Sequence, residues 1–590
     1  MNTVTLTIDG KQVTVPENYT ILEAANELGI NIPRLCYLKG INETSACRVC
    51  VVEIEGMRTL KNSCTVKVQN NMVVRTNTDR VKNSVKRNLM LLASNHKFDC
   101  WRCPRERNCE FLHLLRKYNI ENAMGENPYF TKKRYITNIT DAIVLDSSKC
   151  ILCGRCVSAC QKLAGTSVLD FNERGYNTYV STAQNHTLED SGCIYCGKCI
   201  QSCPTGALRE REQIDDVLDL LAKKEYYTVV QIAPSVRAAL GEEFGYPIGT
   251  NVEGKLYNAL YKLGFDDITD TNFAADVTIM EEGTEFIHRL EEYKKGNKNV
   301  LPMFTSCSPG WIRYIEQYYP EFLPNLSTCK SPQQMQGALI KNYYAQKINV
   351  PKEKIKVVSI MPCIAKKYEA KRPEMQVDGI ADVDYVLTTR ELARMIKRQD
   401  IDFRALEDIQ PASPMAKYTG AGVIFGATGG VMEAALRTVR DILEKKDYSD
   451  VDFAAVRGAD NGIKEVELEI AGEKLTVAVV HGAVNFKEMF ERVKQNPGKY
   501  AFVEFMACTG GCVNGGGQPI VNAEVLEKID VRKERAKAVY GIDADKKLRK
   551  SHQNPAVIEL YDEFLGKPGG EKSHKMLHTH YTKKEIYSKI

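Results

Sequence analysis

Cysteines are the residues of this chain whose types and spacing most clearly predict chemistry. The 590-residue sequence contains 20 of them, and 15 lie before residue 204 in short, repeated spacings. Clustered cysteines without a secretory signal favour metal ligation over disulfides. The first residues, MNTVTLTIDG, alternate like a strand, and no apolar run is long enough to cross a membrane. We therefore expect a cytoplasmic metalloprotein.

Two CxxCxxCxxxC runs give the most specific signal. Their cysteines are Cys150, Cys153, Cys156 and Cys160 in the first run, and Cys193, Cys196, Cys199 and Cys203 in the second. This pattern is typical of bacterial two-cluster ferredoxins, in which the fourth cysteine of each run ligates the other cluster. One [4Fe–4S] cluster is then expected on Cys150, Cys153, Cys156 and Cys203, and another on Cys193, Cys196, Cys199 and Cys160.

Two further groups precede these runs. The first, expected to hold a [2Fe–2S] cluster, comprises Cys36, Cys47, Cys50 and Cys64. The second has only three cysteines, and a histidine four residues before them can supply the fourth ligand of a [4Fe–4S] cluster; it comprises His96, Cys100, Cys103 and Cys109. A zinc ion held by one histidine and three cysteines is the alternative for this second group. The four groups follow one another along the chain, as an electron path requires.

The remaining five cysteines should mark the destination of that path. They are Cys307, Cys329, Cys363, Cys508 and Cys512. Apolar strands are expected at residues 300–304, 357–361 and 502–506, each running into a cysteine. Because ligands of α/β folds collect at the carboxyl ends of strands, these cysteines can converge on one buried site. Cys508 and Cys512, four residues apart, are expected on one helix face. The glycines at 515–517 allow close backbone approach.

The elements that must position these residues divide the chain into five expected parts. Alternating residues 4–8 and 13–15 around an Asp-Gly turn, followed by a helical pattern at 21–29, predict a β-grasp [2Fe–2S] domain at 1–78. The other parts are a domain with the histidine-containing group at 79–140, a two-[4Fe–4S] ferredoxin domain at 141–210, an α/β catalytic domain at 211–520, and a helical segment at 521–590 that packs on it. The fold class is thus α+β cluster domains followed by a large α/β domain.

Three segments of the catalytic part resemble the signature segments of [FeFe]-hydrogenases. They are TSCSPGW (305–311), MPCIAKKYE (361–369) and EFMACTGGCVNGGGQP (504–519). The resemblance covers essentially the whole chain, and the four accessory groups resemble those of the long members of the family. It implies reversible formation of H2 from two protons and two electrons at a six-iron H-cluster. In that family a [4Fe–4S] cubane is joined to a two-iron unit with CO, cyanide and a dithiolate amine bridge.

The resemblance also implies roles for individual residues. Cubane ligands would be Cys363, Cys508 and Cys512, the last bridging to the two-iron unit. Contacts to the cluster would come from Lys366 to one cyanide, Pro234 and Ser235 to the other, Gln333 to a carbonyl ligand, and Met361 and Met506 by packing. The proton relay would run through Cys307, Glu282, Ser327 and Glu285. Without the signature segments, the two glutamates would be read as surface acids of a helix.

One residue departs from the family pattern. The family's first segment usually reads TSCCP, with a relay cysteine followed by a cubane ligand, whereas this chain has Ser308 at the second position. We expect Ser308 to occupy the ligand position and Cys307 to remain the relay thiol, because neighbours at a strand end point opposite ways. A local twist that makes Cys307 the ligand is the alternative.

Other functions remain open at this point. The chain could be the catalytic subunit of an electron-bifurcating or NAD(P)-reducing complex, a non-catalytic hydrogenase-like assembly protein, or an H2 sensor. It has no trustworthy dinucleotide motif, so flavin and nicotinamide chemistry would come from partner subunits. Expected partners are H2 and protons, ferredoxin or flavin/NAD(P)-binding subunits, and maturation proteins. A net charge of +5 argues against nucleic-acid binding, and no membrane association is expected.

Overall fold

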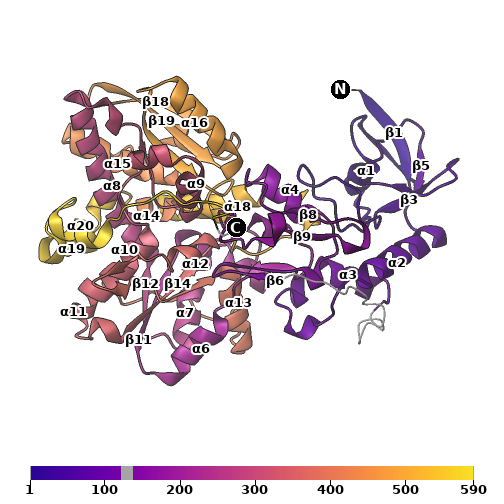
Figure 1. Ribbon diagram of the computed structural model, residues 1–590, viewed down its shortest axis with the longest axis horizontal. Helices are drawn as coiled ribbons and strands as arrows, with labels where there is room; N and C mark the ends of the chain where they lie inside the picture. Colours follow the sequence, from indigo (N-terminus) through magenta and orange to yellow (C-terminus); the bar gives the residue numbers. More distant parts are fainter. Residues whose placement is uncertain (1, 121–136, 589–590) are drawn as a thin grey trace.

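The computed structural model describes residues 2–120 and 137–588. Cluster-bearing N-terminal elements form an arm on one side, and the larger α/β body fills the other (Figure 1). The expected order of β-rich cluster domains followed by a mixed helix-and-sheet body is confirmed. Residues 121–136 of the expected second domain lie outside the described residues. No helix among the described residues is both long and apolar enough to cross a membrane.

The first domain is a five-stranded sheet with the order β2-β1-β5-β3-β4. Its strands are β1 (Thr3–Ile8), β2 (Lys11–Pro16), β3 (Val51–Ile54), β4 (Lys61–Asn62) and β5 (Val73–Arg75). The expected β1–β2 hairpin is present, and Asp9 and Gly10 have positive φ angles of 47° and 79° that suit a tight hairpin turn. Helix α1 (Ile21–Glu27) begins at a capping box in which the Thr20 hydroxyl and the Glu23 carboxylate satisfy free amides.

Helices flank or carry the three cysteine groups that follow the first domain. Helix α2 (Asp79–Ala93) ends just before His96, and α3 (Glu110–Lys117) starts just after Cys109. The two ferredoxin runs repeat one design, in which a glycine with positive φ precedes a helix: Gly154 before α4 (Arg155–Lys162) and Gly197 before α5 (Lys198–Ser202). Both glycines adopt the left-handed conformation that a side chain would disfavour. A small antiparallel sheet of β6 (Thr137–Ile139), β7 (Ile143–Asp146) and β10 (Leu208–Glu210) lies beside them.

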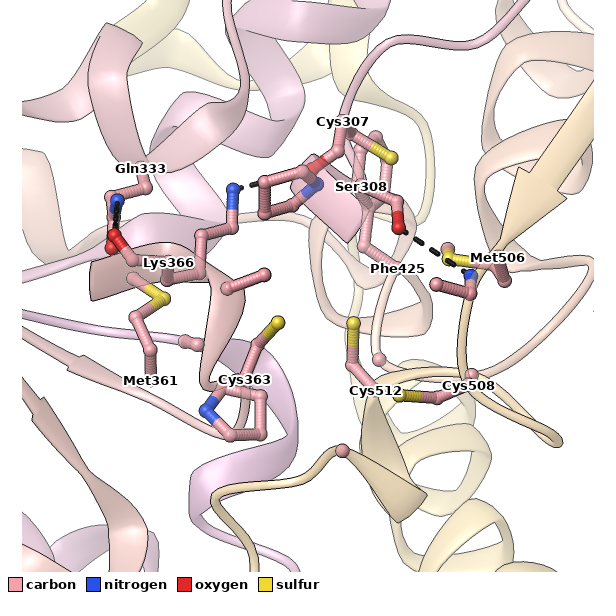
Figure 2. Close-up of a pocket in the computed structure, with 18 of the residues that line it drawn as sticks. Cys307, Ser308, Gln333, Met361, Cys363, Lys366, Phe425, Met506, Cys508 and Cys512 are labelled. Carbon is pink, nitrogen blue, oxygen red and sulfur yellow. Dashed lines mark hydrogen bonds between the residues drawn. The ribbon is translucent and has the colours of Figure 1, made fainter. Parts of the chain in front are cut away.

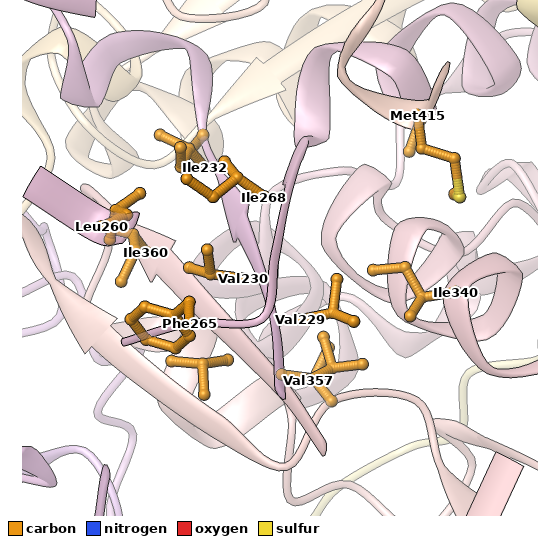
Figure 3. Packing of buried hydrophobic residues seen from close by; sticks show 14 of the residues in the cluster. Val229, Val230, Ile232, Leu260, Phe265, Ile268, Ile340, Val357, Ile360 and Met415 are labelled. Atoms are coloured by element: carbon orange, nitrogen blue, oxygen red, sulfur yellow. The ribbon is translucent and has the colours of Figure 1, made fainter. Parts of the chain in front are cut away.

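The catalytic body is built on two four-stranded sheets. The first is all parallel, in the order β12 (Asp267–Asp270), β11 (Tyr227–Ile232), β14 (Ile355–Met361) and β17 (Tyr385–Thr388). Its strands are almost wholly buried, as strands covered on both faces must be, and their apolar residues form the core drawn in Figure 3. The second has the order β13 (Met303–Phe304), β20 (Tyr500–Met506), β19 (Glu473–His481) and β18 (Ile463–Ile470), with β13, β20 and β19 mutually parallel.

Two of the three strands expected before cysteines are present at close to the predicted length, as β14 and β20. The third, expected at 300–304, is reduced to the two residues of β13. Pro302 explains the difference, because proline has no amide hydrogen to donate to a sheet. The carboxyl ends of β11, β13, β14 and β20 face a common space between the two sheets. The signature segments therefore meet there.

The last part of the chain is helical, with α18 (Val531–Asp545), α19 (Pro555–Leu560) and α20 (Glu571–Leu577). Helix α18 packs against α14 (Gly420–Ile424), and α20 packs against α10 (Pro332–Leu339). Beyond α20 the chain pairs with the loop before α10: the Lys330 amide donates to the Leu577 carbonyl, and the Thr579 amide donates to the Thr328 carbonyl. The C-terminal segment is therefore joined to the loop that follows the first signature segment.

Candidate functional site

A cavity lies between the carboxyl ends of the two sheets (Figure 2). Most of its wall is apolar, with thiols and one lysine set into it. The predicted residues that line it are Pro234, Cys307, Ser308, Gln333, Met361, Cys363, Lys366, Met506, Cys508 and Cys512. Ser235 lies behind Pro234, fully buried, and Gln518 donates hydrogen bonds to its hydroxyl (3.2 Å) and carbonyl (3.0 Å). The three signature segments thus form one site.

Aromatic packing fixes the first signature segment. Trp311, on α9 (Pro309–Tyr318), stacks on Phe505 of β20 with ring centroids 3.8 Å apart. The Trp311 indole N–H donates to the Thr305 carbonyl at 2.9 Å, and the Thr305 hydroxyl accepts from the Phe505 amide at 3.1 Å. These contacts hold the loop between β13 and α9 against β20. Cys307 and Ser308 are therefore presented to the cavity by a rigid loop.

The loop between β13 and α9 changes the prediction for Ser308. Strand β13 ends at Phe304, so the alternation expected of a strand does not extend to positions 307 and 308. Both side chains line the cavity, and the Ser308 hydroxyl accepts a weak hydrogen bond from the Ala507 amide at 3.5 Å. The argument that neighbours must point opposite ways is therefore wrong here, although the ligand position expected for Ser308 stays a prediction.

The expectation that Cys508 and Cys512 share a helix face is also wrong. The chain between them turns through Gly510 and Gly511, whose φ angles are 85° and 89°, and Cys512 only begins a short 3₁₀ turn. Left-handed glycines make this tight turn possible. Both thiols still face the cavity together with Cys363 (Figure 2). A glycine turn, not helical periodicity, brings them together.

The three thiols need a positively charged group to become ligands. Burial, followed by the neighbouring Cys508, raises the pKa of Cys512 to about 12. Burial and the two other cysteines likewise raise the pKa of the Cys363 thiol. Thiolates are the form that binds metal, and the positive charge of a metal centre favours that form. The donor set and the apolar cavity fit a thiolate-ligated iron–sulfur cluster.

Lys366 supplies a cation at the cavity wall. It lies on α12 (Ala365–Glu369), where its ammonium pairs with Glu369 at 2.9 Å and donates to the Cys307 carbonyl at 3.2 Å. The Gln333 amide also donates to Glu369, at 3.0 Å, and accepts from the Ser359 hydroxyl at 2.9 Å. These bonds fix both side chains. The arrangement can offer a charge-assisted hydrogen bond to an anionic ligand in the cavity.

The predicted relay residues lie along helix α8 (Thr271–Lys294) and the loop facing it. Glu282 is 1% exposed, and its carboxylate faces the Ser327 side chain and the Ser306 backbone without a well-formed hydrogen bond. Burial, reinforced by Glu285, raises the pKa of Glu282 to about 8. Burial and then Glu282 raise the pKa of Cys307, so the thiol lies within electrostatic reach of Glu282. The surface-acid interpretation of Glu282 is therefore wrong.

The outer relay residues are hydrogen-bonded. The Ser327 hydroxyl donates to Glu285 Oε2 at 2.9 Å, and Arg289 pairs with Glu285 Oε1 at 2.6 Å. Glu285 is partly exposed, with 15% of its side chain accessible. Together with Cys307 and Glu282, these groups lead from the cavity to the protein surface. Groups of this kind at hydrogen-bonding spacing can pass protons.

The first two accessory groups have different geometries. The [2Fe–2S] cysteines converge within the core of the first domain, with Cys50 and Cys64 sulfurs 3.3 Å apart and the Cys47 amide 3.5 Å from the Cys36 sulfur. His96 is buried, and its Nδ1 contacts the Lys149 carbonyl at 3.0 Å. Burial lowers the pKa of His96 to about 4, so the imidazole is neutral, as a metal ligand must be.

The structure brings the fourth cysteine of each ferredoxin run near the other run. After burial, the groups that raise the pKa of Cys156 are Cys153, Cys150, Cys203 and Cys199. Those that raise the pKa of Cys199 are, after burial, Cys196, Cys193, Cys160 and Cys203. The crossed assignment of the fourth ligands stays a prediction.

The second ferredoxin group touches the active-site cavity. Cys196 lines the cavity, and a side chain on Gly516 would come within 2.4 Å of the Cys196 carbonyl. The glycines at 515–517 therefore allow close approach to protein backbone, at Pro362 and Cys196. Cys196, Phe425 and Gly426 are cavity residues that the sequence reasoning missed. The glycine-rich run GVIFGATGG (422–430) was the signal for the last two.

Comparison with known proteins covers the same regions. Residues 226–516 match the family described as iron only hydrogenase large subunit, C-terminal domain, and residues 529–584 match iron hydrogenase small subunit. Residues 1–79 match a 2Fe-2S cluster binding domain, 80–120 the iron–sulfur centre-binding domain of iron hydrogenase 1-like proteins, and 149–207 a 4Fe-4S dicluster domain.

Individual relatives resemble the chain over its full length. It is 47% identical to the NADP-reducing hydrogenase subunit HndD of Solidesulfovibrio fructosivorans, over 99% of this chain and 100% of the relative. It is 45% identical to iron hydrogenase 1 of Clostridium pasteurianum, over 98% and 100%. A solved structure of a variant of [FeFe]-hydrogenase HydA1 from Chlamydomonas reinhardtii is 38% identical, with a TM-score of 0.57, and the match covers 64% of this chain and 100% of that one.

Proposed function

The chain belongs to the iron-only hydrogenase family, and from this premise we propose which of its residues carry out hydrogen turnover. It is an [FeFe]-hydrogenase, an iron–sulfur oxidoreductase that acts on H2. One observation carries the proposal. The cavity is bordered on one wall by Cys196 of a ferredoxin group and on another by Cys307, which leads to the buried Glu282. Electrons and protons can therefore reach the same enclosed space by separate routes.

The proposed cofactor set is one [2Fe–2S] cluster, three [4Fe–4S] clusters and one six-iron cluster. The match of residues 80–120 to an iron–sulfur centre-binding domain supports a cluster over the zinc alternative for the His96 group.

In the cavity, Cys363, Cys508 and Cys512 would hold the cubane, with Ser308 at the fourth corner. When bound, the six-iron cluster supplies the metal centre at which protons and electrons are converted to H2. The Lys366 ammonium would hold a cyanide ligand by a charge-assisted hydrogen bond. Pro234, Ser235 and Gln333, with Met361 and Met506, would shape the wall around the two-iron unit and exclude water.

Protons would travel between the surface and the cavity through Glu285, Ser327, Glu282 and Cys307. Glu285 exchanges protons with solvent, and the Ser327 hydroxyl, bonded to Glu285, links it to the buried glutamate. A pKa of about 8 lets Glu282 hold and release a proton near neutral pH. The Cys307 thiol would complete the route at the cavity wall.

A second candidate function has the same reaction on H2 but specifies the electron partner of the chain. The 47% identity to a subunit of an NADP-reducing hydrogenase supports a role as the catalytic subunit of such a complex. Partner subunits would then bind flavin and NAD(P), because this chain has no dinucleotide motif of its own. A ferredoxin is the alternative electron partner. Hydrogen-dependent NADP reduction by the purified chain alone would contradict the need for partners.

Anaerobic co-expression with the family's maturation proteins tests the proposal. The matured chain should evolve H2 from reduced methyl viologen and show infrared bands of bound CO and cyanide. The same chain expressed without maturation proteins is the control and should show neither. A matured chain with full iron content but no such infrared bands would contradict it.

A further inference from the structure

Arg105 is a buried arginine in the loop between Cys103 and Cys109. It is 4% exposed, and its Nε and Nη1 have no hydrogen-bond partner in the described part of the chain. Its Nη2 donates to the Asn108 carbonyl at 3.2 Å. A buried guanidinium with unused donors is costly unless a negative charge completes its surroundings. The loop therefore holds a cation that is ready to meet an anionic group.

The guanidinium lies beside the cysteines of the His96 group. The carbonyl that it contacts directly precedes Cys109. Burial raises the pKa of Cys109 to about 11, and Arg105 is one of the groups that oppose this rise. Gly206 packs against the same place, since a side chain on it would come within 2.4 Å of Cys103 Sγ and 3.9 Å of Arg105 Cβ. The unused donors are thus next to buried thiols.

Two further features make the surroundings of these thiols positive. Cys109 is the N-cap of α3, and its sulfur accepts a hydrogen bond from the Leu112 amide at 3.4 Å. The positive end of the helix dipole lies at this point. His96 is neutral, because burial lowers its pKa to about 4, so it adds no negative charge as a fourth thiolate would.

A [4Fe–4S] cluster fits as the missing partner of Arg105. With three thiolates and a neutral imidazole, its oxidised form carries about one negative charge, and reduction by one electron adds another. Charge-assisted hydrogen bonds from a guanidinium are stronger to the more negative form. Hydrogen bonds to the sulfurs of a cluster and positive charge near it therefore raise its reduction potential.

The first ferredoxin run adjoins the His96 group. His96 Nδ1 contacts the Lys149 carbonyl at 3.0 Å, directly before Cys150. The Cys109 sulfur contacts the Pro204 carbonyl at 3.5 Å, directly after the last cysteine of the second run. Under the crossed assignment, these two neighbouring cysteines ligate the same ferredoxin cluster.

The arginine of that ferredoxin group is neutralised. Arg155 lies between Cys153 and Cys156, is 1% exposed, and donates to both carboxylate oxygens of Glu110 at 2.9 and 3.0 Å. Its charge is therefore balanced by a carboxylate, and the cluster beside it is expected to have four thiolates rather than three. Both differences favour a lower potential there than at the His96 group.

We propose that Arg105 donates hydrogen bonds to sulfur atoms of the cluster in the His96 group and sets its reduction potential above that of the adjoining ferredoxin cluster. The inference rests on the cluster proposed above for this group. During H2 oxidation one electron then passes from the ferredoxin cluster, which is oxidised, to the His96 cluster, which is reduced, and no bond or proton is exchanged. Trp101 of the same group is 76% exposed, so the stored electron lies close to the surface.

Redox titration followed by EPR tests the inference in the anaerobically matured chain. The signal to follow is the one that Cys103→Ser removes. In Arg105→Gln the ratio of reduced to oxidised cluster at a fixed potential should fall by about tenfold or more, a shift of about 59 mV for one electron, with unchanged iron content. Arg105→Lys keeps the charge without the planar fork and should lie between the two. Arg107→Gln, which removes an exposed arginine from the same loop, is the matched control and should leave the potential unchanged.

The outcomes separate the role of Arg105 from the presence of the cluster. An unmoved or raised potential in Arg105→Gln, or an equal shift in Arg107→Gln, would overturn the role of Arg105. If Arg105→Gln loses the cluster, Arg105→Lys decides: a retained cluster of lowered potential supports the inference. A retained cluster of unmoved potential, or loss of the cluster in both variants, would overturn it. Absence of this signal from the unaltered chain would overturn the proposed cluster and the inference with it.

Discussion

Glu282 shows how one buried side chain can serve hydrogen chemistry. A carboxyl group buried inside a protein near another carboxylate favours its neutral form, and burial, followed by Glu285, accordingly raises the pKa of Glu282 to about 8. The group therefore carries a proton at neutral pH and can release it at small cost. A carboxylic acid with an ordinary pKa would be ionised at neutral pH. It could pass a proton only through its protonated form, which would be rarely populated.

Glu282→Gln should reduce H2 evolution by about a hundredfold or more, because an amide cannot take up and release a proton. Infrared bands of the active-site cluster should be unchanged. In the unaltered enzyme the rate should also fall as pH rises through about 8, since the raised pKa means that the proton is present below this pH and lost above it. Glu292→Gln, which removes an exposed acid from the same helix, is the control and should keep full activity.

Two adjacent residues are expected to have different roles: Cys307 relays protons and Ser308 ligates the cubane. If Ser308 lies at the fourth corner of the cubane and Cys307 relays protons, Cys307→Ala should retain the cubane and block turnover. Ser308→Cys should restore four thiolates and shift the cubane's EPR signal, because an oxygen donor is harder than sulfur. Iron content, EPR and H2 evolution measure these outcomes. Loss of the cubane in Cys307→Ala would instead identify Cys307 as the fourth ligand.

At the scale of elements, glycines bring the electron-carrying loop against the catalytic loop. The Gly516 backbone approaches Cys196 and Gly197 so closely that an added methyl group would lie 2.4 Å from the Cys196 carbonyl. Gly516→Ala should therefore separate the ferredoxin loop from the loop that carries Cys512. We expect lower thermal stability and slower electron delivery to the active site, measured as loss of methyl viologen-driven turnover at equal iron content.

Gly541→Ala is the matched control for Gly516→Ala. Gly541 lies within helix α18 with nothing within 4 Å of the added methyl group, so alanine should be neutral or should stabilise the helix by about 0.5–1 kcal/mol. Equal behaviour of the two variants in thermal unfolding and in turnover would show that the close approach at Gly516 has no consequence.

The elements also show what the sequence can and cannot predict. Cysteine spacing and runs of apolar residues are local information. The two ferredoxin runs and the strands β14 and β20 could therefore be predicted from the sequence. The shared helix face of Cys508 and Cys512 could not, because two glycines with left-handed φ angles replace helical periodicity there. The position of Cys329 across from His578 could not be predicted for a different reason. The two residues lie about 250 positions apart in the sequence, as the Thr328–His578 pair shows, and backbone pairing brings them together.

Across the whole molecule, the four accessory cluster groups are not arranged in one linear series. Arg155 beside Cys153 donates to the Cys36 and Tyr37 carbonyls of the first domain. Cys109 of the His96 group meanwhile contacts the Pro204 carbonyl at 3.5 Å. Both N-terminal groups thus border the ferredoxin pair that leads to Cys196. We therefore predict that electrons can enter the ferredoxin pair from either of the two N-terminal groups.

Metal content tests this architecture as a whole. The anaerobically matured chain, with no zinc added, should contain about 20 irons, the total for one two-iron, three four-iron and one six-iron cluster. If the His96 group held zinc instead, the count would be about 16 irons with one zinc. Cys103→Ser distinguishes a [4Fe–4S] cluster from a zinc ion in this group. If a cluster is present, the substitution should lower the iron content by about four and leave the zinc content unchanged. Residues 80–120, which contain this group, match an iron–sulfur centre-binding domain, so we expect the iron to fall. Loss of one zinc with no loss of iron would contradict the fourth accessory cluster and leave the first domain as the only electron route into the ferredoxin pair.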